Sequence, residues 1–262
     1  EYMHRSYFDG ADKYCKDTFL LIKYLGTSFL PRLLLIKRRI DQIAENLHFL
    51  PSHISDKILQ FIAQRLPDHL PPRLRRHRDN FEHYMLFLVS DSSIKPMQTL
   101  LDMETSSEID YEYIKCTKSE GRDALLHRYV AGAAPARHRI INESDSGDLL
   151  PLDIALPRNF HDWYKVLPQE ILVKMADSFQ MGHFLCMVFH WDFVLKKGVN
   201  SKEVKRDILK ILDRINAKYP AEHNVGHLYK ADESLQSFYK ILDPKNSFNC
   251  GIGQMSKKKD YR

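Results

Sequence analysis

Apolar residues recur at intervals of three and four positions through much of the first 80 residues. This spacing is clear at residues 12–25 and 34–47, and prolines at 51, 67, 71 and 72 interrupt the segments that follow. A helix turns once in about 3.6 residues, so the spacing gathers apolar side chains on one face, whereas proline ends or kinks a helix. The pattern therefore predicts a mainly helical region over residues 1 to 80.

After Phe81 the pattern changes to short apolar runs that are typical of strands. We predict strands at residues 81–89, 111–116, 149–156 and 183–195. The helices expected between and after them lie at residues 119–134, 163–175 and 201–217. Ser119 and Ser201 are expected to cap the first and the last of these helices. The alternation predicts an α+β fold, with an antiparallel sheet and helices on one face of it.

The composition is that of a folded globular chain. Hydrophobic residues make up 44% and charged residues 28% of the 262 positions, which is enough for a sizeable core. No apolar run approaches the roughly 20 residues that span a bilayer, so any membrane contact is expected to be peripheral. The cysteines have no paired spacing of the metal or redox type, which indicates a reducing cytoplasm; they are Cys15, Cys116, Cys186 and Cys250.

Positive charge is concentrated between residues 29 and 83. Ten Lys and Arg residues stand against six Asp and Glu residues there, a balance of +4 out of a net charge of +5. These cations alternate with Leu, Ile and Phe, a combination that can bind anionic lipid headgroups while the apolar neighbours enter the interface. The predicted membrane-binding cations are Lys37, Arg38, Arg39, Arg73, Arg75, Arg76 and Arg78.

A solvated helical face and a nucleic-acid surface are the two alternatives for this basic stretch. Clustered arginines also neutralise phosphates, so nucleic acid has to be considered. The clusters contain no ladder of aromatic side chains for stacking bases and no nucleic-acid-binding motif, so we expect no nucleic-acid partner. A solvated face is the main alternative to an anionic lipid surface.

Residues 219–230 bring titratable side chains beside a glycine. Glu222 and His223 are adjacent, and Gly226 allows a ligand to approach closely. An imidazole has a pKa near neutrality, so His223 can accept the hydroxyl proton of a bound hydroxy acid while a separate acceptor takes hydride from carbon. The alternative is a turn histidine that bonds only to the backbone.

Motifs along the whole chain resemble a known family. They are Glu-Tyr-Met-His-Arg at the start, Asp-Ile-Ala-Leu-Pro at 153–157, the segments 182–190 and 219–230, and Asp-Pro-Lys-Asn-Ser-Phe-Asn at 243–249. Together they resemble the bacterial quinone-dependent, membrane-associated D-lactate dehydrogenases. Members of that family carry an N-terminal FAD-binding domain, whereas this chain has ten glycines and no glycine-rich phosphate-binding stretch. We therefore expect a C-terminal portion of such an enzyme.

The resemblance implies an activity and a division of the chain. FAD, bound by the missing domain, would take hydride from D-lactate to give pyruvate and pass electrons to quinone, at the cytoplasmic face of the bacterial inner membrane. The expected parts are a basic membrane-binding region at 1–80, a cap or substrate domain of the FAD-linked oxidase type at 81–218, and a C-terminal segment at 219–262 that packs on the FAD domain. The alternatives are a non-catalytic membrane-binding module and a dehydrogenase for another short D-2-hydroxy acid.

The resemblance also assigns roles to individual residues. His223 matches the histidine that serves as base beside the flavin, and Asn224 stands where the related motif has its first glycine, so Asn224 is a candidate cofactor contact. His183 and His190 match a pair that binds a divalent metal with a glutamate, here Glu222. Their alternative role is direct hydrogen bonding to the substrate, and His183 could instead be a core histidine. A continuous strand would place two residues seven apart on opposite faces, so a shared site requires a bulge or bend.

Two further residues belong to this set of candidates. Arg128 matches an active-site arginine of the relatives, and its planar guanidinium can bind a substrate carboxylate through two hydrogen bonds. The alternative for Arg128 is a solvated helix face. Asp153 is expected either to stabilise a strand end or to neighbour the active site. Arg5 and Lys230 are weaker candidates for binding the same carboxylate.

Overall fold

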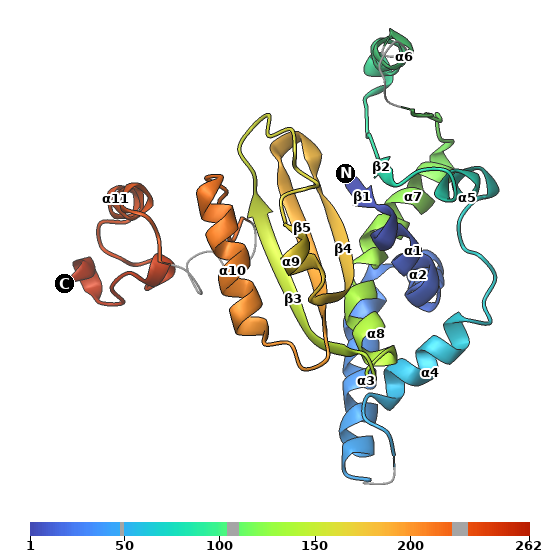
Figure 1. The fold of residues 1–262 in the computed structure, drawn as a ribbon, viewed down its shortest axis with the longest axis horizontal. Helices are drawn as coiled ribbons and strands as arrows, with labels where there is room; N and C mark the ends of the chain where they lie inside the picture. Colours follow the sequence, from blue (N-terminus) through green and yellow to red (C-terminus); the bar gives the residue numbers. More distant parts are fainter. Residues whose placement is uncertain (48–49, 104–109, 222–229) are drawn as a thin grey trace. The chain divides into compact units, whose positions relative to one another are not determined.

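The computed structural model describes residues 1–47, 50–103, 110–221 and 230–262 (Figure 1). These residues form two compact units. The first unit contains Glu1–Leu150, Lys174–Met181 and Asp192–Val199, and the second contains Pro151–Val173, Gly182–Trp191 and Asn200–Arg262. The functional division expected at residues 80 and 218 is a different one, and it stays a prediction.

Helices dominate the first unit. Its α-helices are α1 (Arg5–Tyr14), α2 (Lys16–Leu25), α3 (Leu30–Glu45), α4 (Ile54–Ala63), α5 (Pro72–Arg78), α6 (Ile94–Met103), α7 (Lys118–Ala131) and α8 (Ala134–Ile141). The second unit contains α9 (Gln169–Leu172), α10 (Ser201–Arg214) and α11 (Glu233–Leu242). Short 3₁₀ turns connect several elements: η1 (Thr27–Phe29), η2 (Asp91–Ser93), η4 (Phe184–Cys186), η5 (Ile252–Gln254) and η6 (Lys259–Tyr261).

A five-stranded antiparallel sheet has the order β2-β1-β4-β5-β3. Its strands are β1 (Tyr2–His4), β2 (His83–Met85), β3 (Ser146–Ala155), β4 (Met175–His183) and β5 (Val188–Lys196). In the pairing of β1 with β2, Tyr2 lies opposite Met85 and His4 opposite His83. The sheet and the helices together confirm the predicted α+β class.

Helix α1 supplies the centre of the core of the first unit. Tyr7 and Ala11 are fully buried and belong to one apolar cluster with Phe179 of β4. Gly10 allows the close approach that this packing needs. A Cβ atom on Gly10 would come within 2.8 Å of the Phe179 ring and 3.2 Å of the Ala134 methyl group on α8. A side chain at position 10 would therefore push α1 away from its neighbours.

Helix α10 follows the amphipathic pattern that predicted it. Val204, Ile208 and Leu212, spaced four apart, are the residues that it buries. Its cap differs from the prediction, because the side chain of Asn200, rather than Ser201, accepts hydrogen bonds from two backbone N–H groups of the first turn. Asparagine and serine satisfy these unpaired donors equally well, so the sequence pattern left the cap open to a shift of one residue.

Helix α7 is also confirmed with a corrected start. Thr117, not Ser119, caps it: the Thr117 hydroxyl accepts the N–H of Glu120, and the Glu120 carboxylate accepts the N–H of Thr117. This reciprocal arrangement satisfies two backbone donors that the helix leaves unpaired. The predicted strand just before it, at residues 111–116, is wrong.

Side chains rather than a strand ladder hold the segment at residues 111–116. The Tyr111 hydroxyl donates to the Leu101 carbonyl, and the Tyr113 hydroxyl donates to Asp102 at 2.6 Å. Two tyrosines of the apolar run that predicted a strand are thus anchored to the end of α6. Strand-like alternation yields a strand only where a neighbouring backbone offers a ladder of hydrogen bonds.

The helix predicted at residues 163–175 is wrong as well. Only Gln169–Leu172 is helical, and β4 begins at Met175. Pro168 lies in the middle of the predicted span and adopts an extended conformation just before α9. Proline lacks the N–H that a helix interior requires, and it forces the preceding residue away from helical geometry.

Three other predicted elements are confirmed with different bounds. The helix expected at 12–25 is divided at Cys15 between α1 and α2, and the helix expected at 34–47 starts earlier, at Leu30. The strand expected at 81–89 shortens to β2. Among the described residues, no individual helix has the length and apolar composition to cross a bilayer; Lys16–Leu25 and Thr27–Glu45 meet that test only as a pair bent by 112°.

Candidate functional site

The hairpin of β4 and β5 brings His183 and His190 together. The apolar run that suggested one long strand is interrupted by η4, and Met187 adopts a left-handed conformation with φ of 57°. The two imidazole rings lie 5.4 Å apart between centroids, edge to face at 81°. The bend that a shared site requires is therefore present, and the prediction of one continuous strand at 183–195 is corrected to a hairpin.

Gly182 allows the two strands of this hairpin to approach each other. A Cβ atom at this position would lie 2.9 Å from the Phe189 ring and closer still to the Val188 carbonyl oxygen. Backbone cannot shift as readily as the end of a side chain, so a larger residue here would open the hairpin. The glycine before His183 is thus part of what holds the two histidines near one another.

Asp153 binds His190 from the neighbouring strand. β3 and β5 are adjacent in the sheet, and the His190 Nδ1 atom lies 2.7 Å from the Asp153 Oδ1 atom. Both side chains are largely shielded, with 12% of His190 and 18% of Asp153 exposed. Of the two roles considered for Asp153, this contact favours a neighbour of the histidine pair over a stabiliser of the strand end.

Aromatic residues cover the turn of the hairpin. Trp163 stacks on Phe189 with ring centroids 5.4 Å apart and planes 8° from parallel, and it meets Phe184 edge to face. Stacked and edge-on aromatic pairs add stability beyond their buried area. Trp163 did not figure among the predicted site residues, because its segment was expected to be helical.

The chain that leads into the predicted histidine loop is fixed to the same strand. Ala155 and Lys218 form a β-bridge, and the Ala221 N–H donates to the Asp153 carbonyl oxygen at 3.0 Å. Glu222, His223 and Asn224, which follow directly in the sequence, lie outside the described residues. The last described residue before them is thus hydrogen-bonded to the residue that binds His190.

Helices α3 and α4 expose a group of apolar side chains, which we name the α3–α4 apolar surface. The two helices pack against each other, and 63% of Ile43 and 56% of Phe61 face solvent. A group of this kind marks an interaction surface more often than isolated apolar residues do. Its members are Leu34, Leu35, Ile36, Ile40, Ile43, Ile58, Phe61 and Ile62.

Comparison with known proteins places the chain in a family. The sequence model described as "D-lactate dehydrogenase, membrane binding" matches residues 1–261. The chain belongs to this family. The quinone-dependent D-lactate dehydrogenases of Haemophilus influenzae and Escherichia coli are 43% and 42% identical to it, over 99% and 100% of its length, and that of Corynebacterium glutamicum is 36% identical over 100%. The chain spans 46% of the length of each of these curated relatives.

The family description includes membrane binding, so the surroundings of the predicted membrane-binding cations are informative. Arg38, Arg39 and Arg76 are exposed and form no ion pair with another described residue. The other four predicted cations have acidic neighbours. These pairs are Lys37 with Asp56 at 2.7 Å, Arg73 with Glu120 at 3.1 Å, Arg75 with Asp68 at 3.3 Å and Arg78 with Asp12 at 3.1 Å.

Arg128 of α7 lies in the first unit, whereas His183 and His190 lie in the second. Its guanidinium binds the Glu1 carboxylate, with Nη2 and Nε at 3.1 Å and 3.2 Å from one oxygen. The side chain is 16% exposed, which does not fit a fully solvated helix face. Arg128 is thus oriented by a carboxylate, the group that it is predicted to bind on the substrate.

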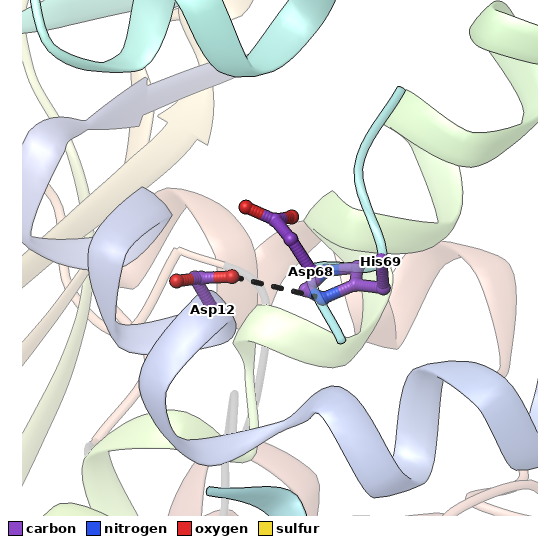
Figure 2. Close-up of side chains that lie close together, drawn as sticks. All are labelled: Asp12, Asp68 and His69. Carbon is purple, nitrogen blue, oxygen red and sulfur yellow. Dashed lines mark ion pairs between the residues drawn. The ribbon is translucent and has the colours of Figure 1, made fainter. Parts of the chain in front are cut away.

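Three potential metal-binding side chains, Asp12, Asp68 and His69, also gather in the first unit (Figure 2). Their candidate ligand atoms lie within 4.8 Å of one another. The two carboxylates, however, already have three cations within 3.6 Å, namely Arg78, Arg75 and Lys16. This balance of charge favours an ion-pair network that fixes α5 to α1 over a metal centre.

A chain of buried imidazoles continues from this network. The His69 Nε2 and His127 Nδ1 atoms lie 2.9 Å apart, and the His127 Nε2 atom lies 3.1 Å from the Phe8 carbonyl oxygen. Because a carbonyl only accepts, His127 donates to Phe8 and therefore accepts from His69. Burial lowers the pKa of His69 to about 4 and that of His127 to about 3. Both rings are thus held neutral.

Proposed function

We propose that this chain is the membrane-binding and substrate-side part of a quinone-dependent D-lactate dehydrogenase. In the full-length protein, FAD held outside this chain takes hydride from carbon 2 of D-lactate, giving pyruvate, and the electrons pass to quinone. The observation that carries the proposal is the family match over residues 1–261, together with three relatives of that name that align with almost the entire chain.

The substrate side of the proposal uses the hairpin histidines and the loop after Ala221. His183 and His190 bind the hydroxyl and carboxylate oxygens of the hydroxy acid, either directly or through a divalent metal that Glu222 helps to hold. Imidazole nitrogens suit a borderline metal such as Zn²⁺ or Mn²⁺, and the two ring centroids lie 5.4 Å apart. His223 serves as the base that removes the hydroxyl proton.

Two residues have supporting roles in this proposal. Asn224 is proposed to contact the cofactor, and Arg128 to provide a guanidinium for the substrate carboxylate. In this role the substrate carboxylate would replace the Glu1 carboxylate, which Arg128 binds at 3.1 Å. Replacing Arg128 by Lys keeps the charge but removes the planar fork.

The membrane side of the proposal uses the α3–α4 apolar surface. Ile36, Ile40 and Ile43 follow a helical spacing along α3 and enter the lipid interface, while Arg38 and Arg39 bind anionic headgroups. Binding is peripheral, on the cytoplasmic face of the bacterial inner membrane. The exposure of this apolar group supports the proposal, since contact with lipid would remove it from water.

The C-terminal segment has a surface suited to the FAD domain. Helix α11 buries none of its residues within the second unit. It exposes Phe238, Ile241 and Leu242, and Phe248 follows with 78% of its surface exposed. We assign this apolar group to contact with the part of the full-length protein that lies outside the chain. Relatives of more than twice the length of the chain leave room for such a part.

The direct test of the proposed activity is the visible spectrum of the full-length protein. Addition of D-lactate should bleach the flavin band, and a soluble quinone should restore it. D-2-hydroxybutyrate, D-glycerate and L-lactate serve as comparison substrates. A spectrum without flavin would contradict the proposal, and faster bleaching by another D-2-hydroxy acid would reassign the substrate. Vesicle binding without any oxidation would favour a non-catalytic module.

A further inference from the structure

We propose that Asp153 is a positioning residue that fixes the proton of His190 on Nδ1 and thereby presents Nε2 as the reactive nitrogen. The inference rests on the proposed function in one respect, namely that His190 faces the substrate. Its geometric basis is the 2.7 Å contact between the His190 Nδ1 and Asp153 Oδ1 atoms.

The chemistry of the two groups assigns the proton in this hydrogen bond. An ionised carboxylate has no proton to donate, so the hydrogen between the two atoms belongs to Nδ1 of the imidazole. In a neutral ring the other nitrogen, Nε2, then carries the lone pair. Asp153 therefore selects one of the two tautomers of His190. It also stabilises the imidazolium form, should the ring take up a second proton.

The strands hold both members of this pair in place. His190 lies between Phe189 and Trp191, which are 0% and 3% exposed and fix β5 by burial on the opposite face. Asp153 is flanked in the same way by Leu152 and Ile154, which are 5% and 0% exposed. Side chains on such rigid strands hold a geometry better than side chains on loops.

The Nε2 atom is the one that both versions of the substrate site require. In the version without a metal, the hydroxyl proton goes to His223, so His190 contacts a substrate oxygen through the Nε2–H of its imidazolium form, which Asp153 stabilises. In the version with a metal, it is the ligand, and a carboxylate on the other nitrogen is the usual partner of a metal-bound histidine. Asp153 thus acts on the same nitrogen in each version, because it holds one ring proton on Nδ1.

The backbone of Asp153 extends this role to the neighbouring loop. Its carbonyl oxygen accepts the N–H of Ala221, 3.0 Å away, and Ala221 is followed in sequence by Glu222 and His223. The same residue therefore orients His190 through its side chain and holds the start of the loop through its backbone. Substitution of the side chain leaves the backbone contact available, so the two effects can be separated.

Nuclear magnetic resonance of the full-length protein, labelled with ¹⁵N at histidine, reads the tautomer directly. His190→Gln identifies the resonances of His190 by their disappearance. On the alkaline side of neutrality, the wild-type protein should show a protonated Nδ1 and an unprotonated Nε2. A protonated Nε2 would overturn the proposal, whatever the activity of the enzyme.

Asp153→Asn tests the consequence for the reaction. An amide can donate to Nδ1 and favour the wrong tautomer, so we expect kcat for D-lactate to fall by about 10- to 100-fold, with FAD content unchanged. Asp153→Glu should restore part of the loss and part of the wild-type ¹⁵N pattern. Asp162→Asn, an exposed position in the same unit, is the matched control and should leave both unchanged.

These results separate the inference from the proposed function. A full-length protein that does not oxidise D-lactate refutes the proposed function, while the ¹⁵N spectrum still decides the role of Asp153. An Asp153→Asn variant with wild-type kcat and KM refutes the positioning role, even in an active enzyme. Where metal analysis finds a bound ion, Asp153→Asn should also weaken its affinity by about 10- to 100-fold; an unchanged affinity contradicts the proposal.

Discussion

The two arginine-rich segments of this chain look alike in sequence and differ in structure. In α5, Arg73, Arg75 and Arg78 each have a carboxylate within 3.3 Å. In α3, Arg38 and Arg39 are exposed beside the α3–α4 apolar surface. A run of cations in a sequence therefore corresponds either to an exposed basic surface or to an internal ion-pair network. The difference depends on which acidic residues the fold brings near: Asp68 is close to α5 in the sequence, whereas Asp12 and Glu120 come from distant segments.

Substituting an arginine of α5 can therefore affect the stability of the fold as well as membrane binding. Replacing Arg73, Arg75, Arg76 and Arg78 together by Gln would remove three members of ion pairs and one cation, Arg76, that has no ion pair with a described residue. Loss of membrane binding by such a variant would therefore not distinguish lipid contact from unfolding. Four predictions separate these effects, in decreasing order of expected size.

Removal of Arg78 should cause the largest loss of stability. Its guanidinium lies 3.1 Å from Asp12 and 3.5 Å from Asp68, and only 19% of the side chain is exposed. Arg78→Gln leaves two shielded carboxylates without their shared cation, which should lower the free energy of unfolding by about 3 kcal/mol. Urea denaturation of the variant and the wild type measures this difference in the free energy of unfolding. Arg76→Gln is the matched control on the same helix and should change stability by less than about 0.5 kcal/mol.

The α3–α4 apolar surface should dominate membrane affinity. Replacing Ile40 and Ile43 by Ser removes two side chains that would each contribute about 1.5 kcal/mol on burial in lipid, so partitioning onto vesicles should fall by about 100-fold. Co-sedimentation with vesicles measures this partitioning. Unfolding in urea should be unchanged, because both residues face solvent. Wild-type vesicle binding by this variant would show that the exposed face has another partner.

The exposed cations of α3 should contribute less, and their effect should depend on salt. Each basic residue near an anionic surface adds about 1 kcal/mol, so Arg38→Gln with Arg39→Gln should weaken binding to anionic vesicles by about 30-fold at low salt. The difference from wild type should shrink as ionic strength rises, since salt screens surface charge. An equal loss on neutral vesicles would contradict this electrostatic role.

Mild acid should lower the free energy of unfolding through the buried histidines His69 and His127, and it should leave the exposure of the α3–α4 apolar surface unchanged. Folding lowers the pKa of His69 to about 4 and that of His127 to about 3. In the unfolded chain both imidazoles keep their ordinary pKa near 6.5, so below that pH the unfolded chain binds more protons than the folded protein. The contribution of these two histidines to the free energy of unfolding is therefore fully present above the unfolded-state pKa, and it is lost as the pH falls through and below that value. Between pH 7 and pH 6 the loss should be about 1 kcal/mol. His127→Leu should flatten this dependence; an unchanged slope would contradict it.

The sequence predicted α10 well because its apolar stripe is the face that it buries. The spacing of α3 also predicted a helix, although most of its large apolar side chains are exposed. It also predicted that His183 and His190 require a bend to meet. It did not place that bend, because an apolar run of this length is equally compatible with one strand and with a hairpin. Asp153 and Trp163 contact the hairpin that carries the two histidines through tertiary interactions, which local periodicity does not encode. The same limit explains the arginines of α5, whose carboxylate partners lie up to 66 residues away, as in the pair of Arg78 with Asp12.

The most direct test of the difference between α3 and α5 is the depth of each segment in lipid. A variant with the exposed cysteines replaced, Cys186→Ser and Cys250→Ser, would carry one environment-sensitive fluorophore on a new cysteine at Ile43 or at Arg76. On binding anionic vesicles, the label at position 43 should shift to the blue and become protected from an aqueous quencher, while the label at position 76 should remain accessible. A label at position 43 that stays in water, or one at position 76 that enters lipid more deeply, would contradict the account.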